Sequence, residues 1–477
     1  MANQKMSNWR WWMCLLLFVA TTVNYMDRQV LSLTYADFIA PEFHWTDDHY
    51  GTITAFFSIF YAVACLFAGK FVDWMGTKKG FLWAIGVWSL GACLHAGCGV
   101  WTQSMVGLEG KEAMIQATGD VVAGIATVSV WLFLACRAIL ALGEAGNFPA
   151  AIKVTAEYFP KKDRALATSL FNAGASVGAL AAPLTIPVLA KAYGWEMSFI
   201  IIGALGFIWM FFWVFMYDKP ETSKFVNKAE LDYIHLDDAA EATEEKAVVT
   251  EEKTIPFLQC FTYKQTWSFI VGKIFTDGVW WFYLFWAPAY FKEMGYGMTT
   301  STGIMLVFVL YLIVTVISIG GGWLPKYFVE TKKMEPYAGR MRSMLIFTAF
   351  PLLALFAQPL QSYSIWWPAI IIGLAGAGHQ AWSANLFSTI GDMFPKSTIA
   401  TITGIGAMAG GLGSFAINKC SGMLFTYAGN QGEAFSFLGY TGKPAAYFIV
   451  FCCCAVAYII AWSIMKTLVP KYKKVEI

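Results

Sequence analysis

The sequence FPKKDRALATSLFNAGASVGA, from Phe159 to Ala179, returns later in the chain as FPKSTIATITGIGAMAGGLGS, from Phe394 to Ser414. The two copies align without gaps at an offset of 235 residues, and an acidic residue precedes each copy at the same distance. Six positions are identical, and in the first copy these are Phe159, Pro160, Lys161, Ala165, Thr168 and Gly178. The repeat predicts a duplicated chain in which each half contains a helix of small residues that packs closely on its neighbours.

The composition places both halves in a membrane. Of the 477 residues, 58% are hydrophobic and only 13% are charged, whereas soluble proteins carry about 25% charged residues. The basic residues are dispersed between apolar runs and form no patch, which excludes nucleic acid as a partner. The ten cysteines show no zinc-ligand spacing, so we expect neither a metal site nor a disulfide framework.

Apolar windows of about 20 residues predict twelve membrane-spanning helices, six on each side of one polar segment. The predicted spans are 11–37, 51–69, 81–100, 122–146, 165–190, 198–217, 267–290, 301–324, 343–360, 366–390, 400–424 and 446–469. They divide the chain into an N-terminal bundle (1–217), a linker (218–265) that is partly helical around 228–241, and a C-terminal bundle (266–477). If both termini are cytoplasmic, 25 of the 33 Lys and Arg residues lie in cytoplasmic segments and five in external ones, as the positive-inside rule requires.

Several motifs resemble one family of transporters. GKFVDWMG, from Gly69, is similar to the loop motif between the second and third spans of the major facilitator superfamily. The equivalent loop of the second half carries Lys326 where the family often has aspartate, so we expect only the N-terminal loop to hold its helices by a charged contact. The segments NYMDR from Asn24, CRAILALGEAGNFPA from Cys136, WWFYLFWAPAYF from Trp280 and GHQAWSANLFSTIGDMFPK from Gly378 resemble its anion:cation symporters, and the last two resemble bacterial hexuronate transporters.

The resemblance implies an all-α membrane protein, with twelve transmembrane helices in two pseudo-symmetric six-helix bundles and a substrate site between them. It further implies a monomer of the bacterial inner membrane that needs no cofactor and couples the uptake of a sugar-acid anion to protons. Sodium coupling is less expected, because the sequence shows no cluster of oxygen ligands at an unwound helix.

The first and fourth predicted spans contain Asp27, Arg28, Arg137 and Glu144, and each such charge inside a bilayer costs roughly 2.5 to 3.5 kcal/mol. Arginine binds a carboxylate with a planar fork and keeps its charge, whereas a buried carboxylate can titrate. The resemblance assigns the substrate carboxylate to Arg28 and proton coupling to Asp27 and Glu144, with Arg137 as partner and second substrate contact. Counting along the spans places Asp27 in the outer half of the bilayer and Glu144 in the inner half. The alternative is a set of structural ion pairs that joins the two spans.

Further candidates offer neutral hydrogen-bonding groups or aromatic faces to a sugar ring. They are Tyr25, Tyr61, Asn172, Trp281, Tyr283, His379, Gln380, Ser383 and Asn385. For Asn385 the alternative is a hydrogen bond between helices, and for His379 it is packing. Lys273 and Asp277 are four residues apart, so we expect a local ion pair with the lysine reaching toward the cytoplasm.

Together these features predict a proton-coupled symporter that imports hexuronates, such as glucuronate or galacturonate, by alternating access. Another sugar acid, such as galactonate or gluconate, is the first alternative, and a non-transporting membrane sensor of the same fold is a remote one. The sequence has no zinc-protease, nucleophile-elbow or nucleotide-binding motif, which argues against a membrane enzyme and against an ATP-driven pump.

Overall fold

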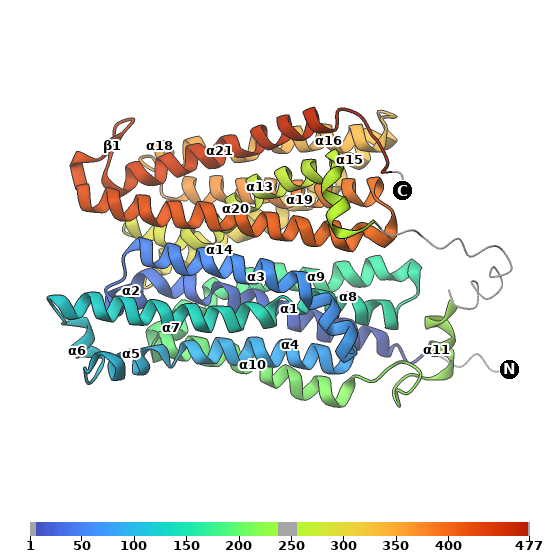
Figure 1. Ribbon diagram of the computed structural model, residues 1–477, viewed down its shortest axis with the longest axis horizontal. Coiled ribbons are helices and arrows are strands. Elements are labelled where there is room, and N and C mark those ends of the chain that lie inside the picture. Colours follow the sequence, from blue (N-terminus) through green and yellow to red (C-terminus); the bar gives the residue numbers. More distant parts are fainter. Residues whose placement is uncertain (1–5, 237–254, 476–477) are drawn as a thin grey trace.

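The computed structural model describes residues 6–236 and 255–475. Within them the chain forms two helical bundles that lie side by side (Figure 1). The described chain begins and ends at one end of the molecule, which we call the terminal end. The helix α6 and the strand β1 mark the opposite end, which we call the loop end.

Six long helices make the N-terminal bundle. They are α1 (Trp9–Thr34), α3 (Asp47–Met75), α4 (Thr77–His95), α7 (Asp120–Glu144), α9 (Lys161–Tyr193) and α10 (Trp195–Met216). Shorter segments connect them: the π-helix η1 (Tyr35–Ile39), α2 (Ala40–Phe43), α5 (Cys98–Val106), α6 (Lys111–Ile115) and α8 (Asn147–Tyr158). The helix α8 continues the span of α7 toward the terminal end.

The C-terminal bundle has five long helices and one broken span. The long helices are α13 (Lys264–Glu293), α14 (Ser301–Ser318), α19 (Trp366–Met393), α20 (Lys396–Gln431) and α21 (Gly442–Leu468). The broken span consists of α16 (Pro336–Phe347), α17 (Ala349–Leu352), η3 (Leu353–Phe356) and α18 (Ala357–Leu360). It is interrupted where prolines supply no backbone N–H to the helix. The remaining segments are η2 (Phe257–Thr262), α15 (Gly320–Glu330), η4 (Gly432–Ala434) and the hairpin of β1 (Ser436–Phe437) and β2 (Tyr440–Thr441).

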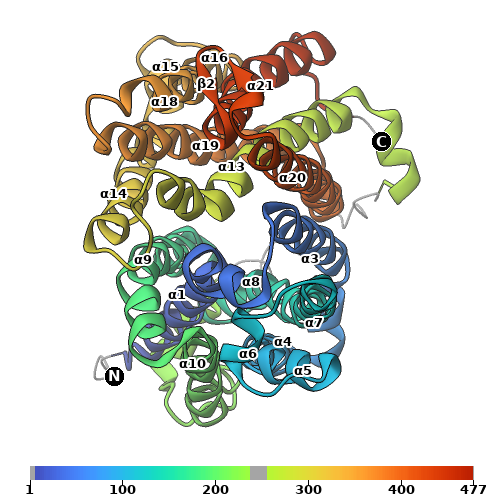
Figure 2. The same cartoon turned by 90° about the vertical axis from the view of Figure 1, so that its left-hand side faces the viewer.

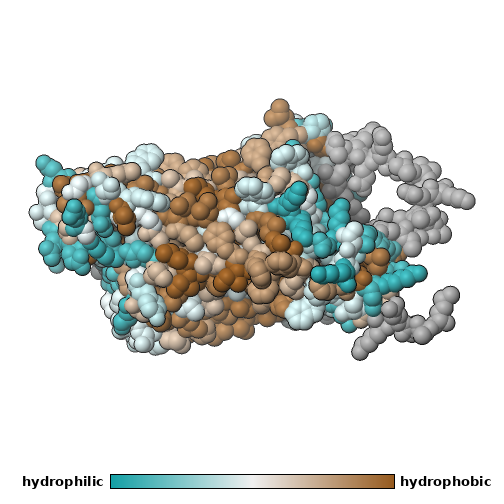
Figure 3. Space-filling view, turned by 90° about the horizontal axis from the view of Figure 1, so that it is seen from below, coloured by the Kyte–Doolittle hydropathy of each residue, from teal (hydrophilic) through white to brown (hydrophobic). Residues whose placement is uncertain are grey.

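The apolar surface confirms the predicted relation to a membrane. The face in Figure 3 carries an apolar belt between two polar ends. In the described part of the chain, seven helical segments are individually long and apolar enough to cross a bilayer, and α4 with α5, bent by 49°, makes an eighth. The four other long helices, α1, α13, α19 and α20, carry buried polar side chains, which lower their hydropathy. These segments together are the twelve predicted spans.

The sequence repeat is also a repeat in geometry. The prolines that precede α9 and α20 have nearly the same backbone angles, φ −62° and ψ 155° against φ −63° and ψ 147°. Gly178 of α9 lies so close to α1 that a Cβ would stand 2.3 Å from the carbonyl oxygen of Thr22. Gly413 of α20 approaches α13 in the same way, at 2.0 Å from the carbonyl oxygen of Ile274. The pair α1 and α9 therefore corresponds to the pair α13 and α20, and the bundles are pseudo-symmetric.

Two helix pairs make much of the seam between the bundles. The helix α3 packs along α20, and α9 lies beside α14 (Figure 2). Helices α1 and α13, which carry the predicted binding residues, also meet across the seam. The duplicated halves thus bring their most polar helices to a common interface.

A linker helix, α11 (Lys228–Ile234), is attached to the start of α1. The buried carboxylate of Glu230 accepts hydrogen bonds from the backbone nitrogens of Trp9 at 2.9 Å and Arg10 at 3.1 Å, and it pairs with the Arg10 guanidinium at 3.0 Å. It therefore caps α1, whose own N-cap residue makes no side-chain cap. The helix predicted around 228–241 begins where expected and ends at Ile234, and residues 237–241 lie outside the described residues.

Candidate functional site

Arg28 of α1 lies buried at the seam. Its Nη2 and Nε donate to one oxygen of Glu144 on α7, at 2.9 and 3.2 Å. The rings of Tyr25, Tyr61 and Trp281 surround the guanidinium, with centroids 5.2, 4.8 and 5.2 Å from its Cζ. Such contacts attract a cation to the aromatic faces. Because Trp281 belongs to α13, this aromatic cage joins the two bundles at a buried charge.

The two other buried charges of this region are not paired with each other. One oxygen of Asp27 accepts a hydrogen bond from the indole nitrogen of Trp88 at 2.7 Å, and the other has no partner among the described residues. Arg137 lies over the ring of Phe57 at 5.1 Å, and within the same residues its Nε and Nη1 have no hydrogen-bond partner. Of the two ion pairs that four charges could form, the described structure contains one.

Asp27 and Glu144 belong to one cluster. Gly143, which precedes Glu144, packs directly on α4, where its Cβ would stand 2.2 Å from the backbone nitrogen of Trp88. The side chain of that tryptophan in turn binds Asp27. The structure therefore does not bear out the expectation that the two carboxylates lie in opposite halves of the bilayer. The count along the span ended too early, because the helix continues from Glu144 through α8 to Tyr158.

Two asparagines extend the cluster and were missed from the sequence. Asn24 lies one helical turn from Arg28 on α1, and Asn147 lies about one turn beyond Glu144, at the start of α8. Both amide side chains are buried, and neither has a partner within residues 6–236 and 255–475. A polar residue one turn from a charge inside a span is the signal that could have found them.

His379 and Asn385 join helices within the C-terminal bundle. The Nδ1 of His379 lies 2.8 Å from the hydroxyl oxygen of Tyr458 on α21, and its ring stacks on Trp280 at 5.4 Å. Asn385 donates from Nδ2 to the carbonyl oxygen of Gly321 at 3.0 Å. This is the interhelical contact that was the alternative for Asn385. A role of either residue in binding stays a prediction.

The remaining predicted contacts differ in their exposure. Tyr283 is buried, Gln380 and Ser383 are half-buried, and Asn172 is exposed on α9. None of the four contacts Arg28 among the interactions of the described residues, so their roles also stay predictions.

Lys273 and Asp277 form the predicted local ion pair, at 2.5 Å. The lysine does not reach toward the terminal end as expected, because its side chain is buried and its Nζ lies 4.7 Å from the ring centre of Phe387. A paired ammonium over an aromatic ring is stabilised where it stands. This pair therefore adds no net charge to the C-terminal bundle.

Charged contacts hold both bundles at the terminal end. In the N-terminal bundle, Asp73 of the loop motif pairs with Lys153 at 2.7 Å. In the C-terminal bundle, Lys326 makes only a local contact, whereas Arg340 at the start of α16 pairs with Asp392 at the end of α19. The expectation that only the N-terminal loop motif holds its helices by a charged contact is therefore confirmed, and the C-terminal bundle uses a pair outside the motif instead.

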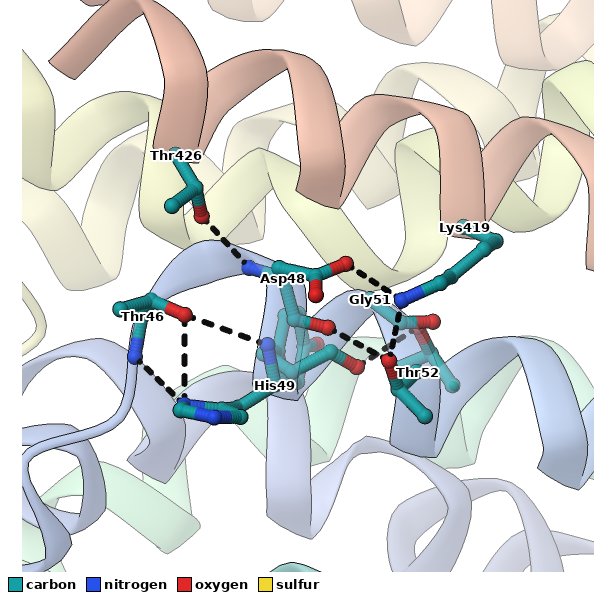
Figure 4. A network of polar contacts seen from close by, with 9 residues as sticks. Thr46, Asp48, His49, Gly51, Thr52, Lys419 and Thr426 are labelled. Atoms are coloured by element: carbon teal, nitrogen blue, oxygen red, sulfur yellow. Dashed lines mark hydrogen bonds and ion pairs between the residues drawn. The ribbon is translucent and has the colours of Figure 1, made fainter. Parts of the chain in front are cut away.

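Lysines close the seam at the loop end (Figure 4). Lys419 of α20 binds Asp48 of α3 at 2.5 Å, and the backbone nitrogen of Asp48 donates to the hydroxyl of Thr426 at 2.8 Å. The start of α3 is fixed by a capping box, in which the backbone nitrogen of Thr46 donates to Nδ1 of His49 at 3.1 Å. Three more of the lysines predicted to be external reach across: Lys443 to Asp47 at 2.8 Å, Lys292 to Asp37 at 3.5 Å and Lys191 to the carbonyl oxygen of Thr299 at 3.4 Å.

The fifth predicted external lysine, Lys111, fastens the long loop 101–121 to the N-terminal bundle. Its Nζ lies 2.7 Å from the buried carboxylate of Glu42 and 3.1 Å from that of Glu196. The indole of Trp195 also donates to Glu42, at 2.7 Å. Burial raises the pKa of the Glu42 carboxyl, although its bonds to Lys111 and Trp195 act in the opposite direction. The loop thus braces α2, which connects α1 to α3 at the seam.

The known proteins that this chain resembles include several transporters of sugar acids. The profile of the Major Facilitator Superfamily matches residues 17–417. The hexuronate transporter of Escherichia coli (strain K12) is 26% identical over 419 residues, which are 86% of each chain. The galacturonate transporter of Dickeya chrysanthemi is 26% identical over 70% of this chain and 87% of its own. The D-galactonate transporter of Escherichia coli O6:H1 is 25% identical over 86% of this chain and 87% of its own.

Solved structures share the fold. A bacterial homologue of the human lysosomal transporter Spinster, in an inward-facing and occupied conformation, has a TM-score of 0.65 and 17% identity, with 97% of each chain covered. A D-xylose-proton symporter has a TM-score of 0.65 and 14% identity, over 94% of this chain and 96% of its own. Two bundles of six spans are therefore the architecture expected for this sequence, and identities this low carry no statement about the substrate.

Proposed function

Because this chain belongs to the major facilitator superfamily, we propose that it is a proton-coupled symporter that imports hexuronates such as glucuronate and galacturonate. The observation that carries the proposal is the buried ion pair of Arg28 and Glu144, surrounded by aromatic rings from both bundles. A hexuronate presents one carboxylate on a sugar ring. The planar fork of an arginine binds the carboxylate, and aromatic faces pack against the sugar ring.

The charge balance of the cluster supports coupling to a cation. Asp27, Glu144, Arg28 and Arg137 sum to zero when all four are ionised. A bound monoanion alone would leave one uncompensated negative charge in a buried site, which is costly. One proton entering with the anion restores the balance. The proton is the preferred cation because the two carboxylates can accept it directly.

The geometry of the ion pair supports an exchange at Arg28. Both donors of Arg28 converge on one oxygen of Glu144, and the other oxygen has no partner among the described residues. A bidentate pair, in which arginine donates to both oxygens of a carboxylate, is stronger than this contact with a single oxygen. In the proposed cycle, a proton neutralises Glu144, and the substrate carboxylate then takes over the guanidinium with both of its oxygens.

Unpaired polar groups near the ion pair supply the remaining contacts. Arg137 offers Nε and Nη1 to the same carboxylate, and the free oxygen of Asp27 offers a second proton site. The amides of Asn24 and Asn147 match the hydroxyl groups of a sugar, because each carries both donors and an acceptor. Buried polar atoms without partners are rare in folded proteins, and exchange with a ligand is one of their uses.

The proposal also sets the orientation of the protein. The terminal end faces the cytoplasm of a bacterium, the loop end faces outward, and the protein works as a monomer in the inner membrane. The contact of Lys419 with Asp48 in Figure 4, together with that of Lys443 with Asp47, then lies on the external side of the seam.

A linear sugar acid is the second candidate substrate. The similarity to the D-galactonate transporter covers nearly as much of this chain as the similarity to the hexuronate transporter. Galactonate presents the same carboxylate to Arg28 but no ring face to Tyr61 and Trp281.

Uptake into proteoliposomes tests the proposal. Labelled glucuronate and galacturonate are offered with and without an inward proton gradient, and with galactonate as competitor. We expect the gradient to drive accumulation of a hexuronate, and Arg28→Ala to abolish it. Accumulation of galactonate alone would replace the proposed substrate by the second candidate. Accumulation that ignores the gradient in the wild-type protein would contradict proton coupling.

A further inference from the structure

The repeat gives Glu144 a counterpart in the second half of the chain. The offset that aligns Phe159 with Phe394 also aligns Glu144 with His379, because α7 and α8 lead into the first copy as α19 leads into the second. Both residues are buried. A carboxylate in the N-terminal bundle thus corresponds to an imidazole in the C-terminal bundle.

Arg28 has a counterpart as well. The two close glycine contacts described above match Thr22 of α1 with Ile274 of α13. The same number of residues further along each helix leads to Arg28 in one and to Trp280 in the other. The helical phase is therefore conserved between the two halves, whereas the chemistry of the side chain is not.

The counterparts touch each other in both bundles. Arg28 and Glu144 form the ion pair at 2.9 Å. Trp280 and His379 form a parallel stack, with ring centres 5.4 Å apart and planes inclined by 4°. The structure thus contains the same helix-to-helix contact twice, once between charges and once between rings.

Burial without a free counter-charge keeps the ring pair neutral. The hydroxyl of Tyr458 donates to the carbonyl oxygen of Thr276 at 3.2 Å, so its oxygen accepts the Nδ1 proton of His379 at 2.8 Å. A neutral imidazole with its proton on Nδ1 makes this bond. An imidazolium would be buried without a free carboxylate, because Asp277, the one acid inside the predicted C-terminal spans, is paired with Lys273. Lys273, which lies two helical turns before Trp280 on α13, is neutralised by Asp277 at 2.5 Å.

We infer that the stack of Trp280 and His379 restricts this transporter to acids with a single carboxylate, because it replaces by neutral rings the position where a second ion pair would stand. This inference rests on the proposed function and deepens it. Sugar diacids carry a second carboxylate at the far end of the carbon chain. With the first one on Arg28, a second one that reaches Trp280 and His379 meets neutral rings and no cation, and burying an unpaired carboxylate strongly opposes binding.

Competition on the wild-type protein tests the inference without any variant. Uptake of labelled glucuronate is measured at pH 7, where both carboxyl groups of galactarate are ionised, against unlabelled glucuronate, galactonate or galactarate. We expect galactarate to compete at least 100-fold more weakly than glucuronate. Competition by galactarate within threefold of glucuronate overturns the inference but leaves the proposed function standing. Failure of every acid to be taken up overturns the proposed function itself.

A matched pair of variants locates the effect. His379→Gln stays neutral and can still hydrogen-bond to Tyr458, whereas His379→Arg adds a cation at the same position. We expect galactarate to compete at least tenfold better in His379→Arg than in His379→Gln. The comparison requires that the two variants have similar melting temperatures, which shows that both are folded. Equal exclusion of galactarate by two folded variants shows that the ring pair does not set the limit. If His379→Arg does not fold, the wild-type competition decides.

Discussion

Lys419 of the C-terminal bundle lies 2.5 Å from Asp48 of the N-terminal bundle, at the loop end of the seam. Both side chains are partly exposed, so this contact is worth only about 0.5 to 1 kcal/mol. It stands beside two other pairs of the same polarity, with the acid on the N-terminal bundle and the lysine on the C-terminal one. The sequence predicts these lysines to be external, against the positive-inside rule, and the structure pairs each of them with an acid across the seam.

Removing this pair is expected to open the loop end more often. In the structure, the hydroxyl of Ser414 lies 2.6 Å from that of Ser58 across the seam. The substitution Ser414→Cys places a thiol at this buried position, deeper in the seam than the pair of Lys419 and Asp48. We expect Lys419→Gln to increase the labelling rate of that thiol by an impermeant maleimide about two- to fivefold, which corresponds to the energy of the pair. Lys326→Gln, at the other end of the molecule, is the control and should leave the rate unchanged. An unchanged rate in Lys419→Gln would show that the pair does not hold the seam.

The capping box at the start of α3 makes stability depend on pH. Burial lowers the pKa of His49, the nearby Asp48 raises it and Lys419 lowers it again. Nδ1 of His49 accepts the Thr46 bond only when it carries no proton. The folded protein thus binds fewer protons than the unfolded one, so stability is lost as pH falls from about 6.5 through the lowered pKa.

The test is the melting temperature of wild type and His49→Gln at pH 7 and pH 5. Glutamine can complete a capping box without titrating. We expect wild type to lose more stability than the variant over this interval, by up to about 1 kcal/mol, which is a usual value for a helix cap. Equal losses in the two proteins would assign the pH dependence to other groups.

The brace formed by the loop 101–121 depends on its lysine. Lys111→Met leaves the buried carboxylate of Glu42 with Trp195 as its remaining contact, and an uncompensated buried charge costs about 3 to 5 kcal/mol before relaxation. Lys111 is partly exposed, so water will reduce this cost. We expect a clear fall in melting temperature, and a smaller one in the double variant Glu42→Gln, Lys111→Met. Equal falls in both would mean that the pairing is not what stabilises the loop.

Substitutions of Arg28 and Glu144 should impair transport in different ways. Arg28→Lys keeps the charge but loses the planar fork, so we expect glucuronate uptake to fall at least tenfold. Glu144→Gln removes the competitor for Arg28, so binding of glucuronate, measured by calorimetry, should be retained or tighter while accumulation driven by the proton gradient is lost. Gradient-driven accumulation at the wild-type level in Glu144→Gln would exclude this residue as a coupling site.

The class of the molecule and its duplication follow from local features of the amino-acid sequence. Apolar length and the placement of Lys and Arg predict twelve spans, because a bilayer imposes both constraints locally on each helix. The repeat around Phe159 and Phe394 predicts two similar halves, and the close contacts of Gly178 and Gly413 confirm them. The local pair of Lys273 and Asp277 was also predictable, since a spacing of four residues fixes it within one helix.

The partners of the buried charges depend instead on how the helices pack. Arg28 could have paired with its neighbour in sequence, but it pairs with Glu144 from another helix, while Asp27 turns to Trp88. Partners on different helices depend on the rotation and depth of each helix, and hydropathy does not specify these. The same holds for Trp280 and His379, whose contact follows from two helices packing as their counterparts do in the other bundle. The sequence supplied the charged and aromatic groups, and helix packing determined which of them meet.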